Sequence, residues 1–118
     1  MKIEVLKCKV HRATVTDSDL NYEGSISMDP ILIEKAGLHA FEKVDILNCD
    51  NGERFTTYVI LGGPGEICLN GPAARKVHRG DKVIILSFAQ IENSEAKAFK
   101  PTLVFVDEKN QIKEITSK

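Results

Sequence analysis

The sequence predicts a mostly-β domain, a small closed barrel with one or two short helices. Short runs of alternating apolar residues separated by turn signals dominate the chain. Asn51-Gly52 between two apolar runs is a strong hairpin signal. Residues 42–47 and 81–86 also echo each other, each with an acidic-Lys-Val opening and an apolar strand. Two such halves favour a pseudo-symmetric barrel, which removes exposed sheet edges.

The strands follow from the apolar runs in order. Asp17-Ser18-Asp19 interrupts the first long run, and residues 70–74 predict a turn and a single helical turn. The tail from Lys109 is polar and is expected to fray. The predicted strands cover residues 3–16 (as one or two strands), 25–28, 44–49, 54–61, 67–69, 82–88 and 103–106.

One helix is predicted after the strand that ends at residue 28. Asp29 is a suitable N-cap, Pro30 suits the first helical position and Gly37 ends the helix. Its buried stripe is expected to consist of Ile31, Leu32 and Ala36.

Length and charge restrict the class of protein. A chain of 118 residues forms one domain, 1–118. Sixteen basic and 17 acidic residues give a net charge of −1, so no overall field indicates nucleic acid or membrane as a partner. No apolar stretch approaches the roughly 20 residues of a spanning helix, and the start lacks a secretory signal. A cytoplasmic protein is expected.

The cysteines and histidines indicate neither a disulfide framework nor a metal site. Cys8, Cys49 and Cys68 lie far apart in strand-like runs and are expected to be reduced, buried thiols. The three histidines lack the spacing of metal ligands.

The dipeptide Gly24-Ser25 carries a possible chemistry of its own. Glycine tolerates strained backbone geometry, which allows the Ser25 hydroxyl to attack the Gly24 carbonyl and move the acyl group from nitrogen to oxygen. Elimination of the ester and hydrolysis would leave a ketone, a pyruvoyl group, at position 25.

Several polar residues are not explained by strand periodicity. Lys9 and His11 share one face of a predicted strand, and Arg54, Thr56 and Tyr58 share a face of another, with Thr57 on the opposite side. Two cations, a phenol and hydroxyl donors beside an acyl-transfer point suit decarboxylation of a small anionic amino acid.

Four motifs carry a resemblance to a known family. They are the segment from Cys8-Lys9 to His11-Arg12, Leu20-Asn21-Tyr22-Glu23-Gly24-Ser25, Asn51 to Tyr58 (NGERFTTY), and Asn70-Gly71-Pro72-Ala73-Ala74. In this order and spacing, from the N-terminus to about Val106, they closely resemble the aspartate 1-decarboxylase family, pyruvoyl enzymes that make β-alanine for pantothenate synthesis. Pro72 and Cys8 depart from the family by standing where smaller or more polar residues are more usual.

The resemblance implies a small closed six-stranded double-psi β-barrel, a homotetramer and active sites between neighbouring subunits. It implies cleavage between Gly24 and Ser25 into a β chain, 1–24, and an α chain, 25–118, that begins with the pyruvoyl group. The sequence does not say whether a maturation factor assists this cleavage.

The resemblance also assigns roles to residues. Ser25, as pyruvoyl, would form a Schiff base with L-aspartate, and Tyr58 would donate the proton that replaces CO₂. Thr57 would assist cleavage and contact the substrate. Arg54 and Lys9 would hold the two carboxylates, Arg54 through a bidentate contact. The remaining implied residues are Asn70, Gly71, Pro72 and Ala73, which would bind the pyruvoyl amide or the substrate, and His11 and Tyr22 as walls of the site.

Three alternatives stay open on the residues alone. The first is a non-enzymatic barrel in which Gly24-Ser25 is only a turn. The second is a DNA-binding relative of the barrel, which the absence of a basic cluster disfavours. The third is a pyruvoyl decarboxylase for another amino acid, since one methylene is worth only about 1–3 kcal/mol of discrimination.

Overall fold

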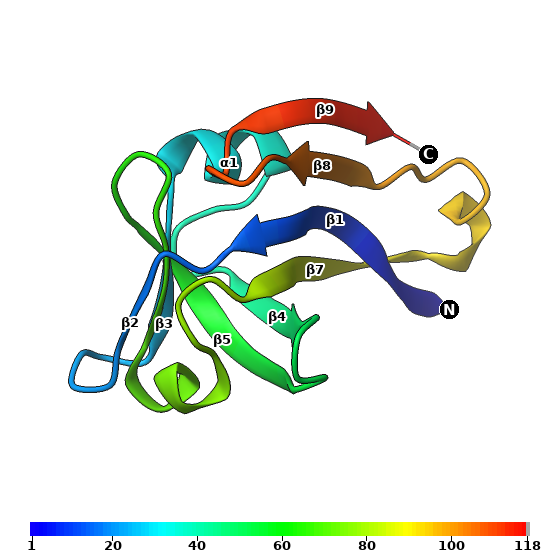
Figure 1. The fold of residues 1–118 in the computed structure, drawn as a ribbon. Helices are drawn as coiled ribbons and strands as arrows, with labels where there is room; N and C mark the ends of the chain where they lie inside the picture. The colour runs from blue at the N-terminus through cyan, green and yellow to red at the C-terminus, as the bar shows by residue number, and fades with distance from the viewer. Residues whose placement is uncertain (118) are drawn as a thin grey trace.

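A computed structural model describes residues 1–117 and confirms a mostly-β fold with short helices (Figure 1). Strands account for most of the described chain, and the single α-helix lies at one end of the sheet. The elements are β1 (Lys2–Thr14), β2 (Asp17–Asp19), β3 (Ser25–Met28), α1 (Pro30–Ala36), β4 (Lys43–Asn48), β5 (Arg54–Leu61), β6 (Ile67–Asn70), the 3₁₀ helix η1 (Gly71–Lys76), β7 (Lys82–Glu92), the 3₁₀ turn η2 (Asn93–Glu95), β8 (Thr102–Val106) and β9 (Ile112–Ser117).

The strands form one mixed sheet in the order β2-β6-β3-β5-β4-β7-β1-β8-β9. The pairs β1–β8, β2–β6 and β3–β5 are parallel and the others antiparallel. The sheet curls around one core to which β1, β3 to β8 and α1 all contribute buried residues, which is consistent with a small β-barrel.

The structure is consistent with the expected small β-barrel, but the sheet as described is not closed. Nine strands are described, and no ladder joins the two end strands, β2 and β9. The β1–β2 connection instead carries the chain from the β1–β7 pairing to the β2–β6 pairing, through two backbone hydrogen bonds. Val15 N donates to Asp81 O at 2.9 Å and Thr16 N to Ile67 O at 2.8 Å.

Helix α1 begins and ends where its capping residues predict. The Asp29 carboxylate accepts a hydrogen bond from Ile31 N at 2.8 Å, and Gly37 adopts φ 79° after the last turn. The expected stripe is wrong at Ile31, which is 58% exposed, whereas Ile33 is buried beside Leu32 and Ala36. A seven-residue helix offers only one side to the core, and positions 32, 33 and 36 share it.

The predicted hairpin and the echoing segments lie at the centre of the sheet. β4 and β5 pair antiparallel from Leu47 opposite Arg54, with Gly52 at φ 76° in the turn between them. The echoing segments become the neighbouring strands β4 and β7, with Ile46 opposite Ile85.

Two segments expected to be irregular are strands. Residues 17–19 form β2, parallel to β6, rather than only a break. The tail is not frayed over residues 112–117, because β9 pairs with β8, with Val104 opposite Ile115. Buried Asn110, at φ 63°, anchors the turn before β9 by accepting from Thr14 N and donating to Thr14 O.

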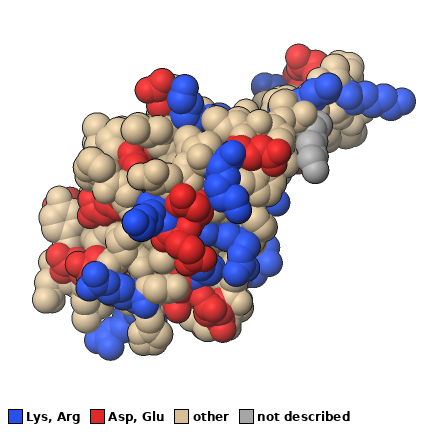
Figure 2. Space-filling view, turned by 45° about the horizontal axis from the view of Figure 1, so that its top comes forward, with Lys and Arg blue, Asp and Glu red and all other residues tan. Residues whose placement is uncertain are grey.

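The surface carries charges of both signs. On the face shown in Figure 2, Lys and Arg side chains are interspersed with Asp and Glu, and neither sign forms a continuous stripe. Within residues 1–117, no helix is long and apolar enough to cross a membrane.

Candidate active site

The Gly24–Ser25 bond lies at the entry to β3, where the chain passes into the core. Ser25 is 1% exposed, and its hydroxyl donates to the Glu23 carbonyl oxygen at 2.9 Å. The Asn70 amide, on the neighbouring strand β6, donates from Nδ2 to Ser25 Oγ at 3.0 Å. The antiparallel register places Ser25 and Asn70 directly opposite each other. Sequence-predicted Ser25 and Asn70 are therefore in contact.

Gly71 holds the backbone of η1 against the Gly24–Ser25 segment. It has φ 67°, and a Cβ at this position would lie 2.7 Å from Gly24 Cα and 2.8 Å from Gly24 N. Only a residue without a side chain permits this approach. Pro72 packs on the same glycine, with its Cδ 3.7 Å from where a Gly24 Cβ would lie.

A cavity of about 350 Å³ opens beside Gly24. It gathers half of the site residues predicted from the sequence, Gly24 together with residues of β5, the end of β6 and η1, whereas Ser25 and Gly71 lie next to Gly24 without lining it. It also includes Phe55, Thr56 and Lys76, which were not among the predicted site residues. Strand alternation offers a signal for Phe55, which shares a face with Thr57, but nothing in the sequence marks Lys76. The lining residues are Gly24, Phe55, Thr56, Thr57, Tyr58, Asn70, Pro72, Ala73 and Lys76.

Lys9 and Arg54 lie on the outer face of the sheet and do not line this cavity. Residues that lie directly opposite each other on paired strands share a face of the sheet. Lys9 lies opposite Leu86, Leu86 opposite Asp45, and Asp45 opposite Thr56, so these side chains share one face. Arg54 lies two residues before Thr56 and so shares that face. The face of β1 that carries Lys9 and the face of β5 that carries Arg54 therefore belong to one surface of the sheet.

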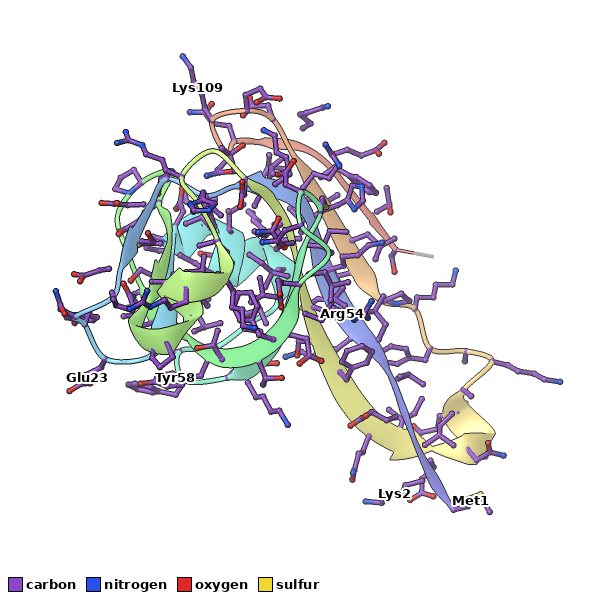
Figure 3. The ribbon with its side chains drawn as sticks, turned by 60° about the horizontal axis from the view of Figure 1, so that its bottom comes forward. Met1, Lys2, Glu23, Arg54, Tyr58 and Lys109 are labelled. Atoms are coloured by element: carbon purple, nitrogen blue, oxygen red, sulfur yellow. The ribbon has the colours of Figure 1, made fainter. Side chains whose placement is uncertain are left out.

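Arg54 borders a second depression, of about 220 Å³. Phe55 and Thr56 line both this depression and the Gly24 cavity. Figure 3 shows Glu23 and Tyr58 at the same side of the molecule and Arg54 set apart from them. Within residues 1–117, neither Lys9 nor Arg54 has an ion-pair partner, which leaves both charges available to an anion.

A β-bulge determines which side of β1 carries Lys9. Lys7 is the extra residue between Leu6 opposite Phe88 and Cys8 opposite Ser87. Lys7 Nζ donates to both Glu42 carboxylate oxygens, at 3.0 and 2.9 Å, and Ser87 Oγ donates to the same carboxylate. Burial raises the pKa of Glu42, but the hydrogen bonds from Ser87 and Lys7 outweigh it and lower the pKa overall.

The two predicted wall residues lie outside the Gly24 cavity. Tyr22 is an exposed side chain. His11 packs edge-on against Phe105, with ring centroids 5.4 Å apart, and lines a separate depression with Arg12 and Lys82. Burial, with Lys9 and Arg12 nearby, lowers the pKa of His11. The imidazole is therefore neutral at physiological pH.

The cysteines are free thiols, and one of them touches the site. Cys8 and Cys68 are buried as predicted, whereas Cys49 is exposed because it lies at the edge of the β4–β5 turn. Cys68 Sγ donates to Asn70 Oδ1 at 3.2 Å. No group of three or more His, Cys, Asp or Glu side chains within residues 1–117 is placed to hold a metal ion.

A family model described as aspartate decarboxylase matches residues 1–113 of this chain. The chain belongs to the aspartate decarboxylase family. Among its curated relatives, aspartate 1-decarboxylase of Syntrophus aciditrophicus is 63% identical over 111 residues, covering 92% of this chain and 96% of the relative. The enzyme of the same name from Campylobacter hominis is 60% identical, covering 94% of this chain and 97% of the relative. That of Wolinella succinogenes is 58% identical over 117 residues, covering 98% and 97%.

Membership of the aspartate decarboxylase family gives the Gly24 cavity a chemical context. The cavity contains a phenol, Tyr58, and a hydroxyl, Thr57, beside the bond between Gly24 and the buried Ser25. Two cations lie on the adjoining outer face, beyond the shared residues Phe55 and Thr56.

Proposed function

We propose that this chain decarboxylates L-aspartate to β-alanine and CO₂, supplying pantothenate and hence coenzyme A synthesis. The proposal depends on its membership of the aspartate decarboxylase family. The structural observation that carries it is the Gly24–Ser25 bond, packed against Gly71 and contacted by the Asn70 amide.

The proposed enzyme is made as a proenzyme that cleaves itself between Gly24 and Ser25. The products are a β chain, 1–24, and an α chain, 25–118, whose first residue is a pyruvoyl group. Ser25 Oγ attacks the Gly24 carbonyl carbon, and charge develops on the carbonyl oxygen. A hydroxyl donor aimed at that oxygen stabilises the charge. Thr57, which shares the cavity with Gly24, is the proposed donor.

The surroundings of Ser25 fit a pyruvoyl group. This group supplies a ketone that condenses with the substrate amine and withdraws electrons as CO₂ leaves. Asn70 Nδ2 already donates to Ser25 Oγ and is placed to donate to an oxygen at this position. Gly71, Pro72 and Ala73 follow directly in η1, and Pro72 and Ala73 form the adjoining wall, where backbone groups can hold the substrate.

Aspartate brings two carboxylates, which call for cations. Arg54 presents a planar fork that binds a carboxylate through two hydrogen bonds, and Lys9 provides a compact second charge. Tyr58, in the Gly24 cavity, is the proposed proton donor to the carbon that loses CO₂. A phenol O–H is a donor and can deliver its proton at that step.

We further propose that the enzyme works as a homotetramer with sites between neighbouring subunits. In one chain, Lys9 and Arg54 do not line the Gly24 cavity, so a neighbouring chain is the proposed source of both cations. His11 and Tyr22, also outside that cavity, then serve as walls contributed across the interface. A cytoplasmic location belongs to the same proposal, because three free cysteines suit a reducing compartment.

The test compares Ser25→Ala with Ser18→Ala, a serine replacement on β2 away from the cavity. Wild type and Ser18→Ala should release CO₂ from L-aspartate and form β-alanine, and Ser25→Ala should remain one uncut, inactive chain. L-glutamate, assayed in parallel, should be a poorer substrate. Normal turnover by Ser25→Ala would refute the mechanism. Equal or better turnover of L-glutamate would instead refute the assigned substrate.

A further inference from the structure

Four polar side chains lie buried together on one face of the β3–β6 pair. The antiparallel register sets Ser25 opposite Asn70 and Ser27 opposite Cys68, and residues two apart on a strand share a face. Asn70 is 3% exposed and Cys68 is 7% exposed. With water largely excluded, these groups must satisfy their hydrogen bonds within the protein, with one another or with nearby backbone groups.

The Asn70 amide is held at both of its ends. Nδ2 donates to Ser25 Oγ and to Ser27 Oγ, both at 3.0 Å. Oδ1 accepts from Cys68 Sγ at 3.2 Å. The two ends of an amide differ in chemistry, one a donor and one an acceptor. The group that faces Oδ1 therefore decides which end is turned toward Ser25.

The Cys68 thiol acts as a constant donor in this arrangement. Burial raises the pKa of Cys68 to about 11, and the nearby carboxylates of Glu66, Asp17 and Asp19 add to this effect. The thiol is therefore protonated at physiological pH. If the amide were rotated, its NH₂ would face the S–H and its oxygen would face the two serine hydroxyls.

The orientation of the amide matters for the Ser25 hydroxyl. In the observed arrangement Ser25 Oγ accepts from Asn70 and directs its own proton to the Glu23 carbonyl oxygen, 2.9 Å away. In the rotated arrangement Ser25 would be drawn into donating to Asn70 Oδ1, and the bond from Nδ2 would be lost.

We propose that Cys68 is a positioning residue for self-cleavage, which fixes the Asn70 amide so that Nδ2 faces Ser25. This inference rests on the proposed function. In the step concerned, Ser25 Oγ bonds to the Gly24 carbonyl carbon, the Gly24–Ser25 C–N bond breaks, and the hydroxyl proton passes to the released amine. Loss of the Ser25 Cα proton and of the Gly24 carboxylate then forms dehydroalanine, and one water converts it to pyruvoyl with release of ammonia.

The test follows cleavage by intact mass from freshly made precursor, so it does not depend on decarboxylase activity. Cys68→Ala should cleave about tenfold more slowly, the effect of losing one hydrogen bond of roughly 1.4 kcal/mol. Cys68→Ser keeps a donor and should restore cleavage to near the wild-type rate. Cys8→Ala, which removes the other buried thiol, is the matched control and should cleave like wild type. If Cys68→Ala is insoluble, Cys68→Val replaces it as a non-donor that fills the space.

A double-mutant cycle separates positioning from a general loss of packing. In an Asn70→Ala background no amide remains to be oriented, so adding Cys68→Ala should slow cleavage no further. Additive slowing would overturn the inference, as would wild-type cleavage by Cys68→Ala. Either result leaves the proposed function intact, provided that the wild-type chain cleaves. A wild-type chain that never cleaves would overturn both.

Discussion

The backbone of Gly71 occupies a position where any side chain would meet Gly24. Two properties make it irreplaceable, its φ of 67° and the 2.7 Å between a Cβ built on it and Gly24 Cα. Gly37 provides the comparison, because its φ of 79° carries the same backbone preference but nothing lies within 4 Å of its Cβ position. Comparing Gly71 with Gly37 separates the free-energy cost of the left-handed backbone conformation from the cost of a steric clash with Gly24.

Gly71→Ala should therefore do more harm than Gly37→Ala. Gly37→Ala should lose about 1 kcal/mol of unfolding free energy through its left-handed conformation, and should still cleave. Gly71→Ala must also push the Gly24–Ser25 segment away, so cleavage should slow by at least about tenfold, the effect of 1.4 kcal/mol on a barrier. Urea unfolding and intact mass measure the two effects. Equal behaviour of both variants would mean that the close approach has no role.

At this scale the structure brings some of the residues named from the sequence together: Ser25 lies opposite Asn70, and Thr57 lines the cavity beside Gly24. Motifs within the sequence were enough to single these residues out, and their roles in the site stay predictions. The contact of Cys68 with Asn70 was not found, because an apolar strand position looks the same whether its thiol fills space or donates a hydrogen bond.

Among the elements, the bulge in β1 connects stability to the placement of Lys9. Its extra residue, Lys7, is tied to Glu42, which Ser87 also contacts. Because the side-chain period of a strand is two, a shift of one residue against β7 would turn Lys9 to the opposite face. The Lys7–Glu42–Ser87 cluster thus stabilises the register that leaves Lys9 on the outer surface.

The lowered pKa of Glu42 predicts a dependence of stability on pH. Burial opposes the shift, but the hydrogen bonds from Ser87 and Lys7 prevail. A carboxyl group with a lower pKa in the folded state stabilises the fold above its unfolded value of about 4.3, and this contribution is lost as pH falls through the folded pKa.

Glu42→Gln tests this linkage. Urea unfolding from about pH 6 down to pH 3 should show wild type losing more stability than the variant, since only wild type protonates Glu42 in that range. The difference in unfolding free energy between the two proteins should be largest at the upper end of this pH range. Parallel curves would show that Glu42 contributes nothing to the acid sensitivity of the fold.

Elements encoded by local signals were predictable, and those encoded by distant contacts were not. Helix α1 and the β4–β5 hairpin carry their own caps and turn residues. β9 has only Ile112 and Ile115 as apolar residues, and it becomes a strand because β8 lies beside it. The bulge at Lys7 could not be predicted either, because a bulge is defined only by how β1 pairs with β7.

At the scale of the whole molecule, the separation of Arg54 from the Gly24 cavity predicts that chains share sites. Ser25→Ala and Arg54→Ala should each be inactive or poorly active alone. Co-expressed chains should regain activity, because random mixing in the proposed symmetric tetramer would join an intact Ser25 to an intact Arg54 in about one site in four. The measurement is β-alanine formation by the purified mixed assembly.

Lys9→Ala mixed with Arg54→Ala is the matched control. Lys9 and Arg54 lie on the same outer face of one chain, so every neighbouring chain lacks one of the two cations and no site is restored. Recovery in this control, or none in the first mixture, would contradict a site assembled in this way.

The central claim is that the chain makes its own ketone by breaking the bond between Gly24 and Ser25. Intact mass spectrometry of the purified wild-type protein tests it most directly. We expect a small fragment ending at Gly24 and a large fragment beginning at position 25, lighter by one ammonia than the same fragment beginning with serine. A single unbroken chain of 118 residues, or a large fragment that retains an N-terminal serine, would contradict the claim.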